Sequence, residues 1–184
     1  SVGVGIGVGA EALPLLQWSS SEGGEGGARA VPDPRGSGNG SGVFSRFGRV
    51  VDVGGGRGHL LSAILDANPG VRGVLFDRPE VVEAAKAGGH HPRMEFVGGS
   101  FFEEVPPGDA TLLMEVLHDW NDEDTVRILR TIRRAAAPES RLLVIEADVG
   151  EGDGPTWGKL IDIIMMTIFA GRQRARAEFA RLFE

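Results

Sequence analysis

The sequence predicts an α/β protein with a doubly wound, mostly parallel sheet, and two observations support this fold class. From Val43 onward, apolar runs of strand length alternate with segments of helical period, a pattern typical of successive βαβ units. The run VVDVGGGRGHL at positions 50–60 places four glycines directly after β-branched residues. Such a stretch is the sharp turn from a strand into a helix that a ligand can approach closely.

Composition excludes several classes of function. The chain has 184 residues and is 41% hydrophobic, which is enough for one sizeable core. A formal net charge of −7 gives no basic surface, so we expect no nucleic-acid partner. The chain has no cysteine, which removes disulfides and thiolate chemistry and is consistent with a cytoplasmic protein. The apolar start, SVGVGIGVGAEALPLL, is too short and too interrupted to cross a membrane, so we expect no membrane association.

Two regions of different composition divide the chain. Residues 19–42 consist mainly of glycine, serine, proline and charged residues, which cannot bury enough apolar surface to fold. The repeat VGVGIGVG alternates like a strand, but its glycines weaken a strand. We therefore predict that residues 1–42 are a disordered, low-complexity segment and that residues 43–184 form one domain.

Strands and helices alternate regularly within this domain. The predicted strands are Arg49–Val53, Val71–Phe76, Met94–Val97, Ala110–Met114 and Arg141–Glu146. The predicted helices lie near Gly58–Ala67, Pro79–Ala87, Asp122–Ala136 and Gly158–Phe169. Right-handed crossovers place such helices on both faces of a parallel sheet. The ligand of a doubly wound sheet binds outside the carboxyl ends of its strands, where the polar residues below are found.

The spacing in the glycine turn argues against a dinucleotide. The glycines follow a GxGxG pattern at positions 54, 56 and 58, and the third glycine of the dinucleotide motif would fall on His59. Asp77 ends the second strand 23 positions after Gly54, close to the ~20 at which an acid binds a ribose diol. Alternatively, Asp77 caps the helix that begins at Pro79. Without a phosphate-binding lysine, the pattern favours a nucleoside cofactor, and S-adenosylmethionine fits that description.

Six segments in order carry a resemblance to a known family. They are VVDVGGGRG, VLFDRPEVV, VGGSFFEEVPPGDA, LHDWNDED, LLVIEADV and GRQRARAEF. Together they resemble the S-adenosylmethionine-dependent O-methyltransferases of the caffeate and bacterial polyketide type, over about Phe44 to Glu184. The resemblance implies a Rossmann-like class I methyltransferase fold, S-adenosylmethionine as cofactor and a small hydroxylated aromatic as acceptor.

The same resemblance implies a set of cofactor-binding residues. They are Asp52, Gly54, Gly55, Gly56, Gly58, Asp77, Arg78, Gly99, Ser100, Phe101, Met114 and Trp120. Three of these depart from the family pattern: Ser100 stands where relatives have an acid for adenine, Met114 where many have lysine, and Arg78 where most have leucine. Serine is still an acceptor but lacks the charge.

Histidine is the expected base, because its usual pKa suits removal of a phenolic proton. Of the four histidines, His59 lies in the glycine turn, where we expect it to face solvent or packing and not to act as a base. We expect His90 and His91 to lie in a solvated loop between a helix and a strand. The resemblance assigns the base to His118 in LHDW and its orienting acid to Glu146 in LLVIEA. It also brings a second acid to the histidine, at a position where this chain has Gln173, which cannot stabilise an imidazolium by charge.

The acceptor pocket and the ends of the chain complete these expectations. The resemblance places Asp119, Met165 and Phe169 against the acceptor, although Asp119 can also cap the following helix and the other two can be core residues. No ligand cluster predicts a metal site. Relatives are homodimers through an N-terminal helical domain, and this chain has the glycine-rich segment in its place. It also stops before the final strands of relatives, so we expect one open sheet edge.

Two other functions compete with methyl transfer. A truncated, non-catalytic remnant that binds S-adenosylmethionine is suggested by Ser100, Met114 and Gln173. A nicotinamide-dependent oxidoreductase is a third possibility, which the GxGxG spacing and the LHDW motif disfavour.

Overall fold

The computed structural model describes residues 44–89, 91–146 and 171–183, together with positions 17, 18, 28, 29, 162 and 165. Its longer strands are β3 (Arg49–Val53), β4 (Arg72–Asp77), β5 (Met94–Gly98), β6 (Ala110–Met114) and β7 (Arg141–Ile145). Its helices are α1 (His59–Ala67), α2 (Pro79–Ala87), the 3-10 turn η1 (Leu117–Asp119), α3 (Asp122–Ala135) and α5 (Arg176–Leu182).

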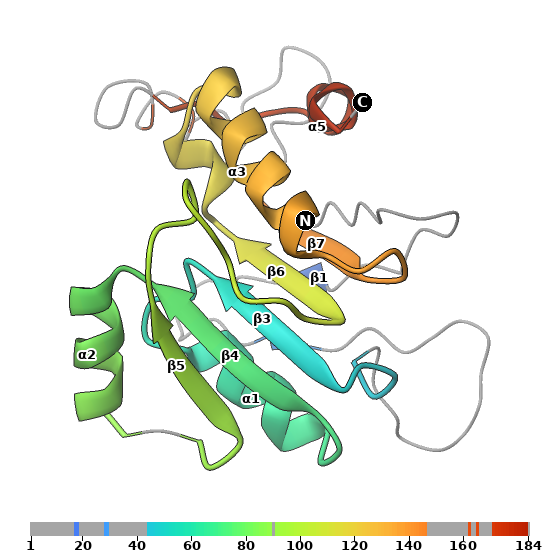
Figure 1. Cartoon of the computed structure of the whole chain (residues 1–184). Helices are drawn as coiled ribbons and strands as arrows, with labels where there is room; N and C mark the ends of the chain where they lie inside the picture. Colours follow the sequence, from blue (N-terminus) through green and yellow to red (C-terminus); the bar gives the residue numbers. More distant parts are fainter. Residues whose placement is uncertain are drawn as a thin grey trace.

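The five longer strands form one parallel sheet in the order β5-β4-β3-β6-β7 (Figure 1). The chain moves outward from β3 to β5, then crosses back to β6 on the other side of β3. Such a reversal creates a crevice at the carboxyl ends of the two central strands. The predicted α/β, doubly wound class is confirmed, and the crevice lies at the β3/β6 junction.

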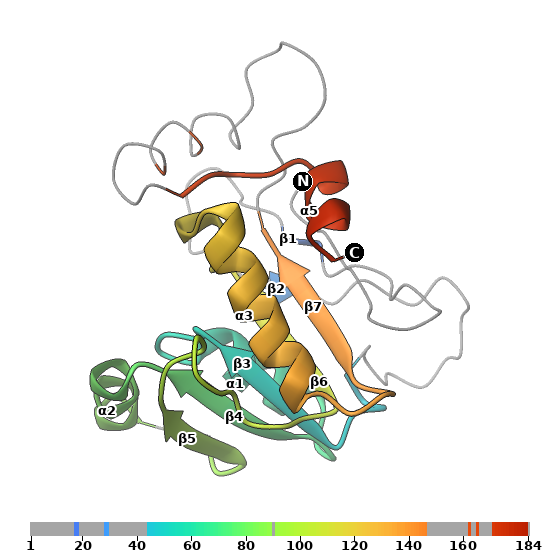
Figure 2. The same ribbon diagram turned by 45° about the horizontal axis from the view of Figure 1, so that its top comes forward.

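Helices cover both faces of the sheet because the side chains of each strand alternate between two cores. Val50 packs with α1, whereas Val51 packs with α3. Leu75 and Phe76 divide in the same way between the two cores. Figure 2 shows α3 in front of β6 and β7, with α1 behind the sheet.

Local sequence explains where the helices begin. The backbone of Gly58 is left-handed at the start of α1, with φ 76°, which glycine adopts without steric cost. Pro79 begins α2, where its missing N–H would be unpaired in any residue. Asn121 caps α3 by accepting a hydrogen bond from the Asp124 N–H, 2.9 Å away.

The predicted elements agree with the structure to within a residue or so at each end, and the differences lie elsewhere. Helix α5 was not predicted; its seven residues are too short for a clear helical period. Of the predicted helix 158–169, only positions 162 and 165 are described, and both are helical. Within predicted disordered residues 1–42, β1 (Gln17–Trp18) and β2 (Ala28–Arg29) form a short antiparallel pair, and the rest lies outside the described residues. Among the described helices, none has the length and apolar character to span a bilayer.

Candidate active site

The glycine turn after β3 brings bare backbone to the mouth of the crevice. A Cβ atom on Gly54 would lie 2.8 Å from a methyl group of Val116, and one on Gly55 would lie 2.6 Å from Oδ2 of Asp52. Side chains are therefore excluded at both positions by packing. A Cβ on Gly56 would meet nothing within 4 Å, so this part of the turn faces open space. The predicted close approach of a ligand to this backbone is compatible with that geometry.

Asp77 at the end of β4 is held by the glycine turn itself. Its Oδ2 accepts a hydrogen bond from the Gly56 N–H at 2.9 Å, and its Oδ1 accepts one from the Arg78 N–H at 2.7 Å. Helix α2 has no side-chain cap, so the capping alternative for Asp77 is wrong. Each carboxylate oxygen has a second acceptor site, so this carboxylate is fixed in place and still able to accept from two ribose hydroxyls.

Asp52 is a buried acid with an unsatisfied oxygen. It lies on β3 beneath Gly55, and its Oδ2 has no hydrogen-bond partner. Burial, and then the charge of Asp77, raise the pKa of Asp52 to about 7. A buried polar atom without a partner is costly, and such atoms in clefts are frequent at ligand sites.

Aromatic side chains lie on the segment that follows β5, next to Asp77. The backbone N–H of Gly99 donates to the Asp77 carbonyl at 3.0 Å, which places the GGSFF segment beside β4. The ring of Trp120 is edge-on to Phe101 and Phe102, with centroids 5.7 and 4.8 Å apart. All three rings are partly buried, so their exposed parts can pack against a flat base. Phe102 was not among the predicted site residues, although it stands next to Phe101.

The three departures from the family pattern have different environments. The Ser100 Oγ accepts a 3.3 Å hydrogen bond from the Phe102 N–H, so this oxygen stabilises the local turn of the backbone. The Arg78 guanidinium lies 3.3 Å from Glu80 and is largely exposed; its backbone N–H, not its side chain, contacts Asp77. Met114 is partly buried at the end of β6.

His118 and Glu146 meet as predicted. His118 lies in η1 after β6, and Glu146 directly follows β7. The His118 Nδ1 is 2.7 Å from Glu146 Oε2, and Glu146 Oε1 accepts from the N–H groups of Val116 and Leu117 at 3.0 and 2.7 Å. Because Glu146 is fully buried and bound at both oxygens, it fixes the imidazole with Nδ1 as donor and Nε2 directed away.

Several carboxylates determine the protonation of His118. Burial by itself lowers the pKa of His118, but hydrogen bonds and charge from Glu115 and Glu146 outweigh it and raise the pKa to about 10. Burial raises the pKa of Glu146, and its contact with His118 opposes that rise. Asp119, whose Oδ1 is 3.3 Å from His118 Nε2, also has a pKa raised by burial. The imidazole of the ligand-free protein is therefore cationic at neutral pH.

Glu115 is the site residue that the sequence interpretation missed. Its Oε2 lies 3.2 Å from His118 Nδ1, and it is the one non-glycine residue with positive φ, 53°, in the part of the chain that the structure describes. Its only sequence signal was an acid three positions before the histidine. Glu115, His118 and Glu146 have potential ligand atoms within 4.8 Å of one another, a proximity the sequence did not reveal. The absence of a metal site stays a prediction.

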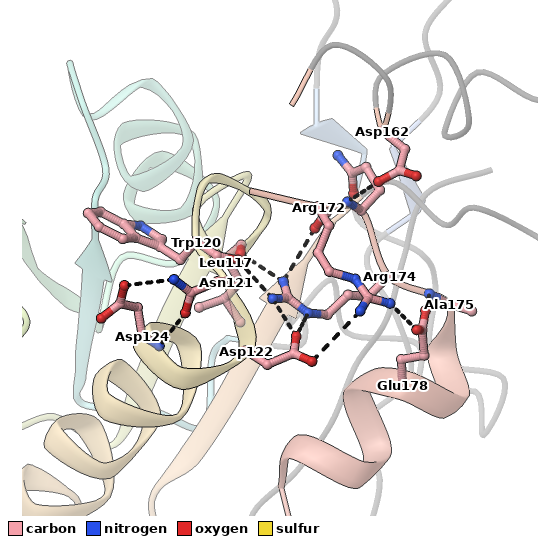
Figure 3. Close-up of polar contacts among 11 residues, drawn as sticks. Leu117, Trp120, Asn121, Asp122, Asp124, Asp162, Arg172, Arg174, Ala175 and Glu178 are labelled. Atoms are coloured by element: carbon pink, nitrogen blue, oxygen red, sulfur yellow. Dashed lines mark hydrogen bonds and ion pairs between the residues drawn. The ribbon is translucent and has the colours of Figure 1, made fainter. Parts of the chain in front are cut away.

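The segment GRQR, residues 171–174, packs against η1, the histidine turn that carries His118 (Figure 3). We call these contacts the clasp. Arg174 is fully buried and donates to the carbonyls of Leu117 and Trp120 at 2.9 and 2.8 Å. Its Nε donates to Asp122 at 2.9 Å. A Cβ on Gly171 would lie 2.0 Å from the His118 carbonyl oxygen, so only glycine fits there. Neither residue was predicted, because the contacts join positions more than 50 residues apart.

Of the remaining predicted residues, Asp119 contacts His118, whereas the Gln173 side chain makes no hydrogen bond to it. Gln173 is buried, and its N–H donates to Asp162 at 2.8 Å, but its side-chain amide has no hydrogen-bond partner. Asp119 lies against His118, and its alternative role as a helix cap is wrong because Asn121 caps α3. Met165 is helical and partly buried, and Phe169 lies outside the described residues.

The two other histidines that the structure describes, His59 and His91, do not join the site. His59 is exposed, as expected, and His90 lies outside the described residues. The expectation of a solvated loop is wrong for His91, whose side chain is 12% exposed and pairs with Asp66 at 3.3 Å.

Comparison with known proteins agrees with this geometry. Residues 40–184 match the family described as the O-methyltransferase domain. The chain belongs to this O-methyltransferase family. It is 44% identical over 146 residues to the mitomycin biosynthesis 6-O-methyltransferase of Streptomyces lavendulae, covering 77% of this chain and 42% of that protein. It is 43% identical to a phenazine O-methyltransferase of Lysobacter antibioticus, covering 76% and 42%.

Solved structures of O-methyltransferases share the fold. Human N-acetylserotonin methyltransferase, in complex with S-adenosylmethionine, superposes with a TM-score of 0.72 at 32% identity, covering 76% of this chain and 41% of that one. The neocarzinostatin O-methyltransferase, with S-adenosylmethionine and 2-hydroxy-5-methyl naphthoic acid, gives 0.68 at 39% identity, covering 76% and 42%. The predicted family and fold are thus confirmed. The chain spans about two fifths of the length of these O-methyltransferases.

Proposed function

We propose that residues 43–184 are the catalytic domain of an S-adenosylmethionine-dependent O-methyltransferase in which His118 is the general base. The observation that carries this proposal is the buried Glu146 on His118 Nδ1, at the same end of the sheet as the glycine turn and Asp77. A histidine oriented through Nδ1 presents Nε2 to a substrate proton.

The residues of the crevice fit S-adenosylmethionine. Asp77 would accept from the ribose hydroxyls, the turn at 54–58 would line the amino-acid part, and Phe101 and Trp120 would pack against adenine. Asp52 offers an unpartnered oxygen close to the turn. When bound, the cofactor supplies a methyl group made electrophilic by its sulfonium. The solved relatives that contain this cofactor support the assignment.

The protein's own part of the reaction is to move one proton. His118 Nε2 accepts the proton of the acceptor hydroxyl, while Nδ1 donates to Glu146 and fixes the ring. The developing imidazolium is stabilised by the buried carboxylate. Because His118 has a pKa of about 10 in the ligand-free protein, it must lose its own proton before it can accept the proton of the acceptor hydroxyl.

The acceptor is a small hydroxylated aromatic or polyketide-like molecule. Relatives named for mitomycin and phenazine substrates, and the naphthoic acid complex, support this class. Asp119 lies next to the base, and Met165 and Phe169 would line the acceptor pocket. We propose that the protein is cytoplasmic, binds neither nucleic acid nor a membrane, and needs no metal ion. Homodimerisation, as implied for full-length relatives, would need parts beyond this domain.

Titration of S-adenosylhomocysteine by calorimetry tests the cofactor site without an acceptor. We expect binding that weakens about 10- to 100-fold in Asp77→Ala, the loss of a charge-assisted hydrogen bond. Glu139→Ala, an exposed acid before β7 at the opposite end of the sheet, is the control and should bind like the wild type. Equal affinity in the Asp77 variant would refute the ribose assignment.

Methyl transfer to a panel of phenols and hydroxynaphthoic acids then tests catalysis. We expect His118→Ala to lower kcat about 10²- to 10⁴-fold, the usual contribution of a general base, with unchanged affinity for S-adenosylhomocysteine. Binding without any turnover would favour the non-catalytic remnant, which Gln173 in place of an acid already suggests. Thermal stabilisation by NAD and not by S-adenosylhomocysteine would instead favour the oxidoreductase.

A further inference from the structure

We infer that Glu115 is a positioning residue that gives His118 its second carboxylate, in a chain that has Gln173 where the family resemblance implies an acid. The inference rests on the proposed function for its meaning in catalysis. The pairing of Glu115 with His118 can be tested whether or not the chain catalyses methyl transfer.

The position of the Glu115 carboxylate supports this role. Its Oε2 is 3.2 Å from His118 Nδ1, the same nitrogen that Glu146 Oε2 contacts at 2.7 Å. Two carboxylates therefore share one imidazole N–H. Glu146 is fully buried, whereas the Glu115 side chain is 38% exposed, so Glu115 remains accessible to solvent.

The backbone at Glu115 provides a second argument. Its φ of 53° lies in the left-handed region, which a residue with a long side chain rarely occupies. Its N–H still donates to the Ile145 carbonyl at 2.9 Å, so the strand pairing extends to this residue before the chain turns into η1. Glycine or asparagine would fit the turn at lower cost. Strained residues of this kind are concentrated at functional sites.

Gln173 does not provide the second carboxylate that the family resemblance implies for the histidine. Its side-chain nitrogen and oxygen are buried and have no hydrogen-bond partner, so it makes no hydrogen bond to the imidazole. Even in contact, a neutral amide would not stabilise an imidazolium by charge. Glu115 directly follows β6 and contacts His118 from three positions earlier in the chain.

The other charged groups around His118 are accounted for in the described part of the chain. Asp119 of η1 faces Nε2 at 3.3 Å, and Glu146 after β7 faces Nδ1. From the C-terminal segment, the Arg174 guanidinium binds the neighbouring Leu117 carbonyl and is itself paired with Asp122. Glu115 and Glu146 share Nδ1, and of these two Glu115 is the one that solvent reaches.

The test is an NMR titration of the His118 imidazole in the whole chain, in EDTA, with His118→Gln to assign the signal. Glu115→Gln removes the charge, and we expect the pKa of His118 to fall by about one unit, the usual effect of losing a nearby opposite charge. Glu139→Gln makes the same change of charge at the other end of the sheet and should leave the titration unchanged.

Two further variants keep the test decisive. Glu115→Gly suits the left-handed backbone, so it should fold even if Glu115→Gln does not, and should lower the pKa equally. Glu115→Asp keeps the charge on a shorter side chain and should restore part of the pKa. If His118 titrates as in the wild type in folded Glu115→Gln or Glu115→Gly protein, the inference is overturned.

Activity is a separate readout. In an active chain, the acidic limb of the pH profile of kcat/KM should move to lower pH in Glu115→Gln by the same amount as the NMR pKa. A chain without methyl transfer would contradict the proposed function, and the titration would still decide the role of Glu115.

Discussion

His118 is surrounded by three carboxylates that act differently on its proton. Glu146 is buried and fixes Nδ1, Glu115 shares that nitrogen from a partly exposed position, and Asp119 lies at Nε2. The site therefore holds the cationic imidazole strongly. A general base must be neutral to accept a proton, so this electrostatic stabilisation limits catalysis at neutral pH.

The rate of methyl transfer should increase with pH. Since kcat/KM reports the ionisation of the free enzyme, we expect it to rise as pH approaches the His118 pKa of about 10. The measurement is a pH profile between pH 6 and 10.5 in buffers of constant ionic strength. A profile that is flat above pH 7 would contradict a histidine held cationic in the free protein.

The ionised form of Asp52 should destabilise the fold. Burial raises its pKa to about 7 in the folded protein, above the usual value near 3.8, so folding is favoured with Asp52 protonated. This contribution is complete below pH 3.8 and is lost as pH rises through 7. Asp52→Asn should therefore gain stability over the wild type between about pH 4 and 7, reaching a few kcal/mol.

Urea unfolding at pH 4, 6 and 8 measures that gain. Glu139→Gln, an exposed acid before β7, is the control and should show no comparable trend. If the difference in unfolding free energy between Asp52→Asn and wild type does not grow with pH, the ionisation of Asp52 does not destabilise the fold and the prediction is wrong.

At the scale of elements, the segment 171–183 holds η1 in place. Arg174 meets two carbonyls and Asp122 with one planar guanidinium, and Phe179 of α5 lies 5.9 Å beneath it. Nearby, Arg172 pairs with Asp122 and Glu178, and Glu178 accepts from the Ala175 N–H at 2.8 Å. Figure 3 shows these contacts joining the start of α3 to the start of α5.

Arg174→Lys should weaken this clasp. An ammonium group cannot reproduce the forked geometry of guanidinium, and the carbonyls of Leu117 and Trp120 would lose donors. We expect a loss of roughly 3 kcal/mol of stability, typical of a broken buried charge contact, measured by thermal or urea unfolding. Arg133→Lys, exposed on α3, is the matched control, and an equal loss there would contradict the clasp.

Gly171→Ala tests the same clasp from its other end. The added methyl group would overlap the His118 carbonyl, so the turn must shift. We expect kcat to fall by at least tenfold, because His118 moves with the backbone that the methyl group displaces. A variant with unchanged kcat would show that the histidine turn tolerates displacement.

Sequence reasoning succeeded where the pattern is local and failed where it is not. The strands and helices α1, α2 and α3 follow from apolar periodicity, and Asp77 follows from its place at a strand end. His118 and Glu146 follow from the resemblance to the family. Glu115 was missed because its contact depends on a left-handed backbone that glutamate rarely adopts. Arg174 and Gly171 were missed because contacts with η1, more than 50 residues away, and no local pattern select them.

At the scale of the whole molecule, the proposed cofactor contacts come from β3, β4, the segment after β5, and the turn after β6. A ligand that spans them stabilises the folded state by mass action. At 100 times its dissociation constant, S-adenosylhomocysteine should add about 2.7 kcal/mol, which raises Tm by roughly 5–10 °C for a domain of this size. Differential scanning fluorimetry measures the shift, and Asp77→Ala should reduce it.

The clasp between Arg174 and the carbonyls of Leu117 and Trp120 also has a consequence for synthesis. These partners are 57 and 54 residues apart along the chain. A ribosome that adds 5–20 residues per second needs roughly 3–11 s to pass from one to the other. The turn that carries His118 in a nascent chain therefore lacks its contacts with Arg174 for seconds after it has been made.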